Sequence, residues 1–330
     1  MFNRLARTDA GECGYAIDMA KALRIAGGNR QGRSAPAKDD PRRTRRLTFP
    51  VFQPRFPLAL GAGARVFTIG SCFARNIEEA LLPLGAVLPT RRFAPPKSEY
   101  PNRPSGLLNE FNPGAVARRI LDAFDGAESP ADTIVVSGTG HADLLLVGGG
   151  DVTLERAVAR RQEIANIYRD LPGADATIVT LGLAECWFDR RTDRYLNRAP
   201  PFGMATSDPG RFEFRRLGVA QSLALLVPAF ERLAEAEMKT IVSVSPVPLS
   251  TTFTPDDAMV ADGYSKSVLR VCADELARSF PNVDYFPSLE IVRSGGPWAY
   301  EADGVHVTDA VVQRITAWMV DQYGGARETA

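Results

Sequence analysis

The chain has 330 residues, with 39 Lys+Arg balanced by 39 Asp+Glu and 45% hydrophobic residues. This length allows one large α/β domain or two ordinary domains, and the composition is that of a globular protein rather than a fibrous or disordered one. A net charge of zero argues against a protein that works mainly by coating nucleic acid or an anionic membrane, so we predict no specific nucleic-acid partner. No run of about 18 uninterrupted apolar residues is present, which predicts no transmembrane segment.

The start of the chain lacks the apolar core and small-residue cleavage site of a secretory signal. The four cysteines form no C-x-x-C pair and are too few for a disulfide scaffold: Cys13, Cys72, Cys186 and Cys272. We therefore expect free thiols and a cytoplasmic protein. The two histidines, His141 and His306, cannot build a zinc site of the usual composition without distant cysteines. We expect no metal and no cofactor.

The first 47 residues differ in charge from the rest of the chain. Residues 1–50 hold 11 Lys+Arg and 5 Asp+Glu, a net charge of +6, which leaves −6 on the remainder. Residues 27–46 are rich in Gly, Pro, Ser and Arg without an apolar period, so we predict that 1–47 is a basic, disordered tail with a transient helix around 15–26. A solvated tail is favoured over a contact with nucleic acid or acidic lipid.

From residue 48 the pattern is one of short apolar strands and long amphipathic helices. Residues 65–69 predict a strand that ends at a glycine, and residues 75–84 predict the helix that follows it. An apolar run at 132–136 precedes a glycine-containing turn; further strands are predicted at 176–181, 240–244 and 284–286, and further helices at 154–170, 217–237, 262–279 and 308–323. The alternation predicts one α/β domain over 48–325, with a parallel sheet covered on both faces and a flexible end at 326–330. Ligands bind such sheets at the carboxyl ends of the strands.

The sequence Gly70-Ser71-Cys72-Phe73-Ala74 stands between the first strand and the first helix. A nucleophile at such a turn is raised to the top of the sheet, where the helix N-terminus points its amides and positive dipole end at it. These features lower the pKa of a thiol and stabilise an oxyanion. The alternative is a glycine turn in which Ser71 caps the helix and Cys72 is buried.

The second motif is Asp303-Gly304-Val305-His306, just before the last helix. An aspartate three residues before a histidine can orient the imidazole and stabilise its cation, as the orienter and base of a catalytic triad do. The alternative is a surface turn, because Asp-Gly is a common turn dipeptide. Histidine is the usual general base near neutral pH, and this chain has only two of them.

A nucleophile after the first strand and a D-x-x-H before the last helix resemble the SGNH (GDSL-type) hydrolase superfamily. The match is closest to one branch, because GSCFA at 70–74 is the name-giving motif of the GSCFA family. Other stretches are similar to that family as well: LNEFNP at 108–113, TLGLAECW at 180–187, SVSPVPL at 243–249 and YSK at 264–266. The resemblance runs from about residue 48 to 323 and implies a flavodoxin-like three-layer α/β/α sandwich with a parallel central sheet.

The chain departs from the superfamily at the nucleophile. In the G-D-S block the nucleophile is the second residue after the glycine, which is Cys72 here, and Ser71 takes the place of the aspartate. Its position in the block therefore favours Cys72 as the nucleophile, whereas the hydroxyl nucleophile of the superfamily favours Ser71. Since a thiol is the better nucleophile at neutral pH, we favour Cys72, with Ser71 donating a hydrogen bond or capping the helix. The resemblance then makes His306 the base and Asp303 its orienter.

A second departure concerns the oxyanion site. The superfamily's G-x-N-D block supplies an asparagine side chain, but the corresponding stretch from Gly182 to Glu185 has Ala184 at that position. Losing one such donor typically lowers the rate by ~10²–10³. The replacement candidates are the amides of the turn from Gly70 to Phe73, the amide of Gly106 or its neighbours, and the side chains of Asn109 and Asn112. Turn capping around Pro113 is the alternative role for both asparagines.

Four further residues have two interpretations each. Glu185 positions a sugar hydroxyl or caps a strand end, and Trp187 stacks on a substrate ring or belongs to the core. Lys266 binds an anionic substrate group or is an exposed lysine at the start of a helix. His141 lines the cleft or, as its turn-rich setting favours, belongs to a solvated loop.

We predict an acyl-ester hydrolase or O-acyltransferase with a Cys/Ser–His–Asp arrangement, acting on a carbohydrate or another small polar ester. The alternative, suggested by Ala184, is a catalytically weakened scaffold that binds a glycan or a protein. The oligomeric state stays open.

Overall fold

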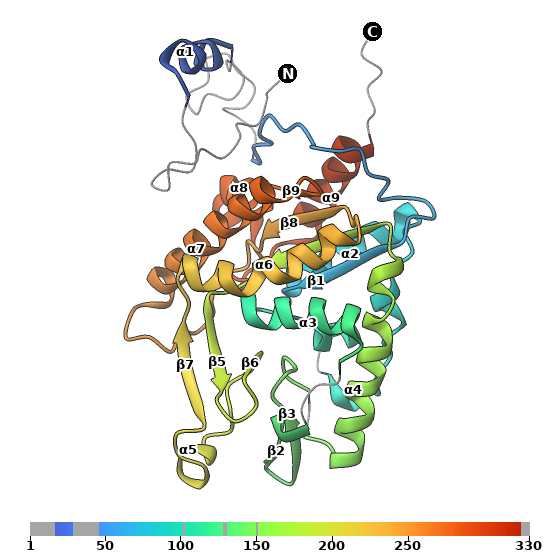
Figure 1. Ribbon diagram of the computed structural model, residues 1–330, viewed down its shortest axis with the longest axis vertical. Helices are drawn as coiled ribbons and strands as arrows, with labels where there is room; N and C mark the ends of the chain where they lie inside the picture. Colours follow the sequence, from blue (N-terminus) through green and yellow to red (C-terminus); the bar gives the residue numbers. More distant parts are fainter. Residues whose placement is uncertain (1–16, 29–45, 101–102, 128–130, 150, 325–330) are drawn as a thin grey trace.

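The structure, a computed structural model, describes residues 17–28, 46–100, 103–127, 131–149 and 151–324. Most of the predicted basic tail and the predicted flexible end therefore lie outside the described residues. Within the tail, α1 (Met19–Gly28) occupies part of the stretch where a short helix was expected, and none of its side chains is buried. Figure 1 places α1 apart from the main body of the protein.

Four parallel strands form the central sheet among the described residues (Figure 1). Their order is β1 (Val66–Gly70), β4 (Ala176–Leu181), β8 (Thr240–Val244) and β9 (Val283–Tyr285). Every residue of the first three strands is buried, as expected for a parallel sheet covered by helices on both faces. The strands predicted at 176–181 and 240–244 are confirmed to the residue.

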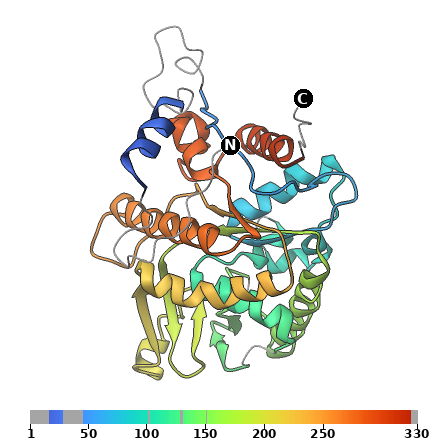
Figure 2. The same cartoon turned by 45° about the horizontal axis from the view of Figure 1, so that its top comes forward.

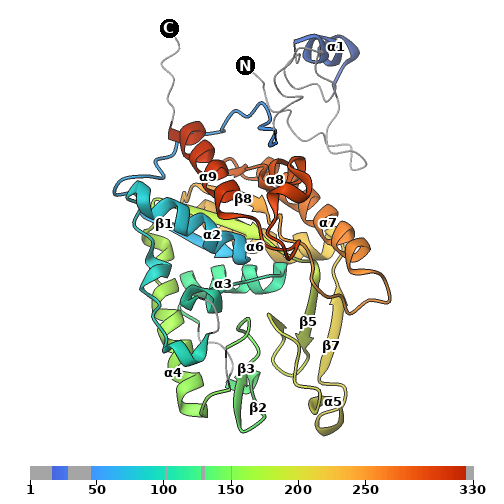
Figure 3. The same ribbon diagram turned by 180° about the vertical axis from the view of Figure 1, so that it is seen from behind.

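Side chains of the strands alternate between two cores, one on each face of the sheet. One core contains Phe67, Val179 and Val242, and it is covered by α3 (Pro113–Asp125), α4 (Leu154–Tyr168), α6 (Val219–Glu235) and α7 (Ala258–Ser279). The other contains Val66, Ile178 and Ile241, and it is covered mainly by α2 (Cys72–Leu81), α8 (Ser288–Ser294) and α9 (Asp309–Gly324). Figures 2 and 3 show the two helical layers on opposite sides of the sheet. The predicted three-layer α/β/α sandwich is confirmed.

The outer edge of β1 carries two isolated parallel bridges instead of a regular fifth strand. Arg65 pairs with Val87 at one end, and Gly70 pairs with Asn109 at the other. The amide of Glu110 donates to the Gly70 carbonyl at 2.7 Å. The chain leaves the sheet after Val87 and returns at Asn109, which therefore lies beside Gly70.

The apolar run at 132–136 does not join the central sheet. It forms β2 (Ile134–Ser137), which pairs antiparallel with β3 (Gly140–Asp143). A separate antiparallel sheet follows, in the order β6 (Arg194–Leu196), β5 (Glu185–Asp189) and β7 (Phe212–Arg216), with α5 (Met204–Ser207) near its tip. Figure 1 shows both hairpin regions projecting below the sandwich. These strands escaped prediction because they are short and lack a long apolar pattern, and β7 is in addition largely half-exposed.

Helix starts differ from the predictions because capping side chains lie upstream of the apolar pattern. α2 begins at Cys72 because Ser71 accepts from the Phe73 amide, and α7 begins at Ala258 because Asp257 accepts from the Met259 amide. α3 was missed, although Asn112 followed by Pro113 is a recognisable helix start. Among the described helices, none has the length and apolar character that crossing a membrane requires.

Candidate active site

The turn after β1 depends on a glycine. Gly70 has φ of +131°, and a Cβ added there would lie 2.1 Å from the carbonyl oxygen of Thr180 on β4. With no side chain in the way, the Ser71 amide reaches Thr180 and donates to its carbonyl at 3.2 Å and its Oγ1 at 3.1 Å. Thr180 therefore joins the turn after β1 to the neighbouring strand, a role that the sequence motifs did not indicate.

The Ser71 hydroxyl is a helix cap. It accepts from the Phe73 amide at 3.3 Å, lies 3.4 Å from the Thr180 hydroxyl, and is part of a residue only 3% exposed. The Phe73 side chain is fully buried in the core covered by α2, so only its backbone faces the turn.

Cys72 is the partly exposed residue of this turn, and its thiol is free. Burial raises the pKa of the thiol; Arg103 and Lys266 oppose this, and so does hydrogen bonding from the amides of Cys72 and Phe73. The Arg103 guanidinium donates to the Cys72 carbonyl at 3.2 Å and to Asn76 Oδ1 at 2.6 Å. Arg103 had no sequence signal, because an isolated arginine in a proline-rich loop has no distinctive pattern.

The turn after β4 packs directly against Ser71. A Cβ added at Gly182 would lie 2.8 Å from the Phe111 carbonyl oxygen and 3.3 Å from Ser71 Cβ. The Leu183 amide donates to the same Phe111 carbonyl at 2.7 Å. Ala184, which the resemblance aligned with the superfamily's asparagine, is fully buried, and its amide donates to Ser265 Oγ at 3.1 Å.

Lys266 is a buried lysine in the interior of α7, not an exposed lysine at its start. The side chain is 1% exposed, its Nζ donates to the Gly182 carbonyl at 2.8 Å, and Asp262 Oδ1 lies 3.9 Å away. Burial lowers the pKa of Lys266 to about 8, and Asp262 opposes this. Together, Ser265 and Lys266 hold the Gly182–Ala184 turn from the helix below it.

Replacing Lys266 by methionine is expected to leave the melting temperature unchanged or to raise it by a few degrees at pH 7. Asp262 keeps two other partners, the Leu249 amide at 3.0 Å and Arg293 at 3.2 Å, so the change leaves no unpaired buried carboxylate. The unfolded chain binds the lysine proton up to a higher pH than the folded chain does, so wild-type stability rises above about pH 8.

The advantage of Lys266→Met should therefore shrink as the pH rises from about 8 towards the ordinary lysine value. Thermal denaturation of both proteins at pH 7 and pH 10 measures the two differences. A variant that melts far below wild type at pH 7 would contradict the expectation.

The two candidate asparagines have different surroundings. Asn112 caps α3 by accepting from the Ala115 amide at 2.9 Å, and its Nδ2 donates to the Leu196 carbonyl at 2.9 Å. Asn109 lies beside Gly70, and its side chain makes no hydrogen bond to any residue that the structure describes, although its Oδ1 is buried. The Gly106 amide donates to the Arg103 carbonyl at 3.1 Å within the same loop.

Asp303 and His306 form the pair that their spacing predicted. His306 Nδ1 lies 2.6 Å from Asp303 Oδ2, and Asp303 Oδ1 accepts from the amides of Val305 at 2.8 Å and His306 at 3.0 Å. These hydrogen bonds, led by that of the imidazole, lower the pKa of Asp303 to about 2. The carboxylate is therefore ionised throughout the neutral range, and it fixes the orientation of the ring.

The loop that carries this pair lies at the carboxyl edge of the sheet. Tyr300 forms an antiparallel bridge with Val307, and its hydroxyl donates to the carbonyl of Pro246, just beyond β8, at 3.2 Å. The following helix, α9, packs on α2 (Figure 3). His306 and Asp303 are 57% and 48% exposed, and no hydrogen bond joins the imidazole to Cys72 or Ser71.

The remaining candidates lie on the antiparallel hairpins. Glu185 is the first residue of β5, and its carboxylate accepts from the Thr252 hydroxyl at 2.7 Å and the Phe253 amide at 3.3 Å. Trp187 packs edge-on against Phe253, with ring centroids 5.2 Å apart, and its indole nitrogen is buried without a partner among the described residues. His141 lies on β3 rather than in a loop.

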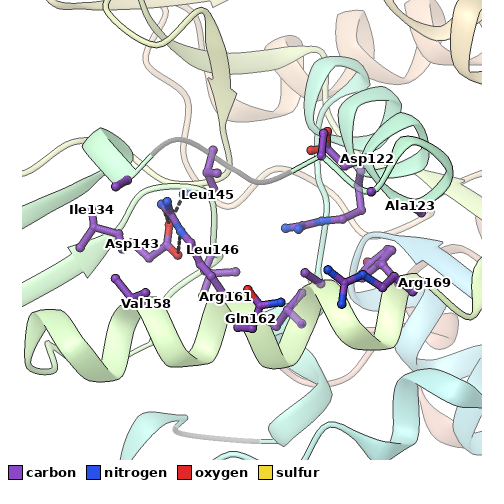
Figure 4. Close-up of a pocket in the computed structure, with 17 residues that line it drawn as sticks. Asp122, Ala123, Ile134, Asp143, Leu145, Leu146, Val158, Arg161, Gln162 and Arg169 are labelled. Atoms are coloured by element: carbon purple, nitrogen blue, oxygen red, sulfur yellow. Dashed lines mark hydrogen bonds and ion pairs between the residues drawn. The ribbon is translucent and has the colours of Figure 1, made fainter.

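A cavity of about 160 Å³ lies elsewhere, between α3, α4 and the β2–β3 hairpin (Figure 4). None of the predicted site residues lines it. Its charged groups are largely paired with each other or with neighbours: Arg161 with Asp143 at 2.6 Å, and Arg119 with Glu110 at 2.7 Å. The cavity is therefore separate from the turn that carries Cys72. The described residues contain no cluster of three or more His, Cys, Asp or Glu side chains that would hold a metal ion.

The parallel sheet, the glycine turn after β1 and the Asp–His pair before the last helix are parts of one three-layer α/β/α sandwich. The chain belongs to the GSCFA family, because the model of that family matches residues 65–318.

Among solved structures, the chain is similar to a single-residue mutant of Axe2, an acetyl-xylooligosaccharide esterase from Geobacillus Stearmophilus. The identity is 14% and the TM-score 0.34, over 83% of this chain and 100% of that one. No curated protein matches the chain.

Proposed function

We propose that the protein is an acyl-ester hydrolase or O-acyltransferase in which Cys72 is the nucleophile, His306 the general base and Asp303 its orienter. The observation that carries the proposal is the partly exposed Cys72 thiol at the N-terminus of α2, at the sheet edge that also holds the Asp303–His306 loop. A helix N-terminus stabilises negative charge on the sulfur and on an adjacent oxyanion.

The choice of Cys72 over Ser71 is supported by their surroundings. The Ser71 hydroxyl is buried and already accepts from the helix that it caps, whereas Cys72 is partly exposed and faces two cations. Burial keeps the resting thiol protonated, so a base must remove its proton. Catalytic hydrogen bonds are often long without substrate, and the exposed His306 ring is proposed to approach the thiol when the ester binds.

The proposed reaction has two halves. His306 Nε2 takes the thiol proton, the sulfur bonds to the acyl carbon, and the carbonyl electron pair moves onto oxygen. When the oxyanion collapses, the ester C–O bond breaks and the imidazolium gives its proton to the leaving alcohol. Water or an acceptor alcohol then loses a proton to His306, attacks the thioester and releases the acyl group and the Cys72 thiol.

We assign the oxyanion donors to the backbone amide of Cys72 at the start of α2 and to the side-chain amide of Asn109. Asn109 is preferred over Asn112 because its side chain has no described hydrogen-bond partner, whereas Asn112 uses both ends of its amide within the fold. A small polar acyl ester, such as an acylated carbohydrate, suits the half-exposed site. Glu185 is not assigned a sugar hydroxyl, because its carboxylate already binds Thr252 and Phe253.

Turnover of 4-nitrophenyl acetate by the wild type tests the proposal, together with His306→Ala and Asp303→Asn. The first variant is expected to lower kcat/KM by about 10³-fold and the second by about 10²-fold. Since Asp303 is ionised far below neutral pH, the loss of its charge should be felt throughout the neutral range. His141→Ala is the matched control and should retain the wild-type rate. Equal rates in all four proteins would exclude the mechanism.

A second function is favoured by one observation, the buried Ala184 in place of an oxyanion asparagine. In that case the protein is a scaffold that binds a glycan or a protein without turnover. The absence of ester hydrolysis by the wild type, together with saturable binding of an acetylated oligosaccharide in calorimetry, would support this alternative over the enzyme.

A further inference from the structure

The ammonium of Lys266 is buried and has spare donors. Three N–H groups are available, yet the only hydrogen bond to a described residue is the one to the Gly182 carbonyl at 2.8 Å. Asp262 is 3.9 Å away and is itself bound to Arg293 and the Leu249 amide. A buried charge without full hydrogen bonding destabilises a fold, so its presence needs a reason other than stability.

The position of Lys266 supplies that reason. Its hydrogen-bond acceptor is the carbonyl of Gly182, the residue whose Cα packs against Ser71. Ser71 in turn precedes Cys72, and the charge of Lys266 acts on the Cys72 thiol. The ammonium therefore lies next to the Gly182–Ala184 turn, which packs against the residue before Cys72.

We propose that the buried ammonium of Lys266 stabilises the negative charge that forms on the sulfur of Cys72. This inference rests on the proposed function for its use in catalysis, but the electrostatic effect on the thiol exists without any ester. Lys266 is thus a positioning residue: its positive charge does not touch the substrate but favours the thiolate form of Cys72. The charged groups around the pair are Arg103, which faces Cys72, and Asp262 and Arg293, which face Lys266.

A purely structural role is the competing explanation, because Lys266 also anchors the Gly182–Ala184 turn. The neighbouring Ser265 provides a matched control, since its hydroxyl anchors the same turn through the Ala184 amide but carries no charge. If the anchor alone mattered, Ser265→Ala and a neutral Lys266 variant would have similar effects. If the charge matters, only the neutral Lys266 variant changes the alkylation rate of the Cys72 thiol.

The test is the pH dependence of Cys72 alkylation by iodoacetamide, read on the Cys72 peptide by mass spectrometry. Lys266→Met is expected to lower the alkylation rate about tenfold at pH 7, where the Lys266 ammonium of the wild type is protonated, and this difference should shrink above about pH 8 as the lysine loses its proton. Lys266→Arg should restore most of the wild-type profile, and Ser265→Ala should leave the profile unchanged. If Lys266→Met fails to fold, Lys266→Gln keeps a donor for Gly182 without the charge and is read in the same way.

A wild-type profile in the neutral variant, or an equal shift in Ser265→Ala, would overturn the inference. The measurement needs no ester turnover, so its outcome is separable from that of the proposed function. A shifted thiol pKa in a protein without esterase activity would leave this inference standing and would remove the proposed function.

Discussion

Replacement of Cys72 by alanine is expected to lower kcat/KM for 4-nitrophenyl acetate by about 10⁴-fold or more, because it removes the proposed nucleophile and the Ser71 hydroxyl is buried as a helix cap. Ser71→Ala should lower it by about tenfold or less. The Ser71 hydroxyl contributes a helix cap, accepting from Phe73 at 3.3 Å, and losing such a cap typically costs about 1 kcal/mol of stability. Steady-state kinetics and thermal melts of both variants separate the chemical effect from the structural one.

Cys72→Ser sharpens this comparison. It puts a hydroxyl at the Cys72 position without disturbing the Ser71 cap, and a serine hydroxyl is a weaker acid and a weaker nucleophile than a thiol. We expect weak activity that depends strongly on His306. If Ser71→Ala abolished turnover while Cys72→Ala retained it, the assignment of the nucleophile would be reversed.

Gly70→Ala is expected to destabilise the protein by about 3–5 kcal/mol. The new Cβ would lie 2.1 Å from the Thr180 carbonyl oxygen and 2.5 Å from Thr180 Oγ1, and φ of +131° is unfavourable for alanine. Because Thr180 is a fully buried residue of a central strand, it has no room to move. The end of β1 must therefore separate from β4, and the bonds of the Ser71 amide to Thr180 are lost.

Gly63→Ala provides the control for backbone strain alone. Gly63 has φ of +78°, but a Cβ added there meets nothing within 4 Å. We expect a loss of about 1 kcal/mol in this variant. Urea unfolding followed by circular dichroism measures both free energies; similar losses at the two positions would show that the contact with Thr180 is unimportant.

The elements with strong apolar patterns could be predicted from the sequence. β4 and β8 consist mostly of β-branched and apolar residues buried on both faces, and their bounds agree with the predictions. The hairpins from β5 to β7 could not be predicted, because charged residues interrupt the apolar pattern of these short strands and β7 is largely half-exposed. The apolar run at 132–136 was predicted to precede a glycine-containing turn, but its pairing partner across that turn could not be predicted, since local apolar character does not distinguish a central strand from a hairpin.

The candidate site likewise contains features that could be predicted from the sequence and features that could not. Spacing alone predicted the Asp303–His306 pair, because three residues in a turn suffice to bring the two side chains together. Lys266 was identified, but its burial was not, because the start of α7 depends on Asp257 and lies upstream of the apolar pattern. Arg103 and Thr180 were missed, since their contacts with the turn join distant segments of the chain.

The sequence by itself determined the fold class and the local motifs, because strand burial, helix capping and short turns depend on neighbouring residues. Only the tertiary structure decided the surroundings of those motifs. It buries the Ser71 hydroxyl as a helix cap, and it leaves the side chain of Asn109, but not that of Asn112, without a described hydrogen bond. It also places the buried ammonium of Lys266 against the Gly182 carbonyl, next to the turn after β1. Burial and long-range hydrogen bonds arise when segments far apart in the chain pack together. No local pattern encodes them.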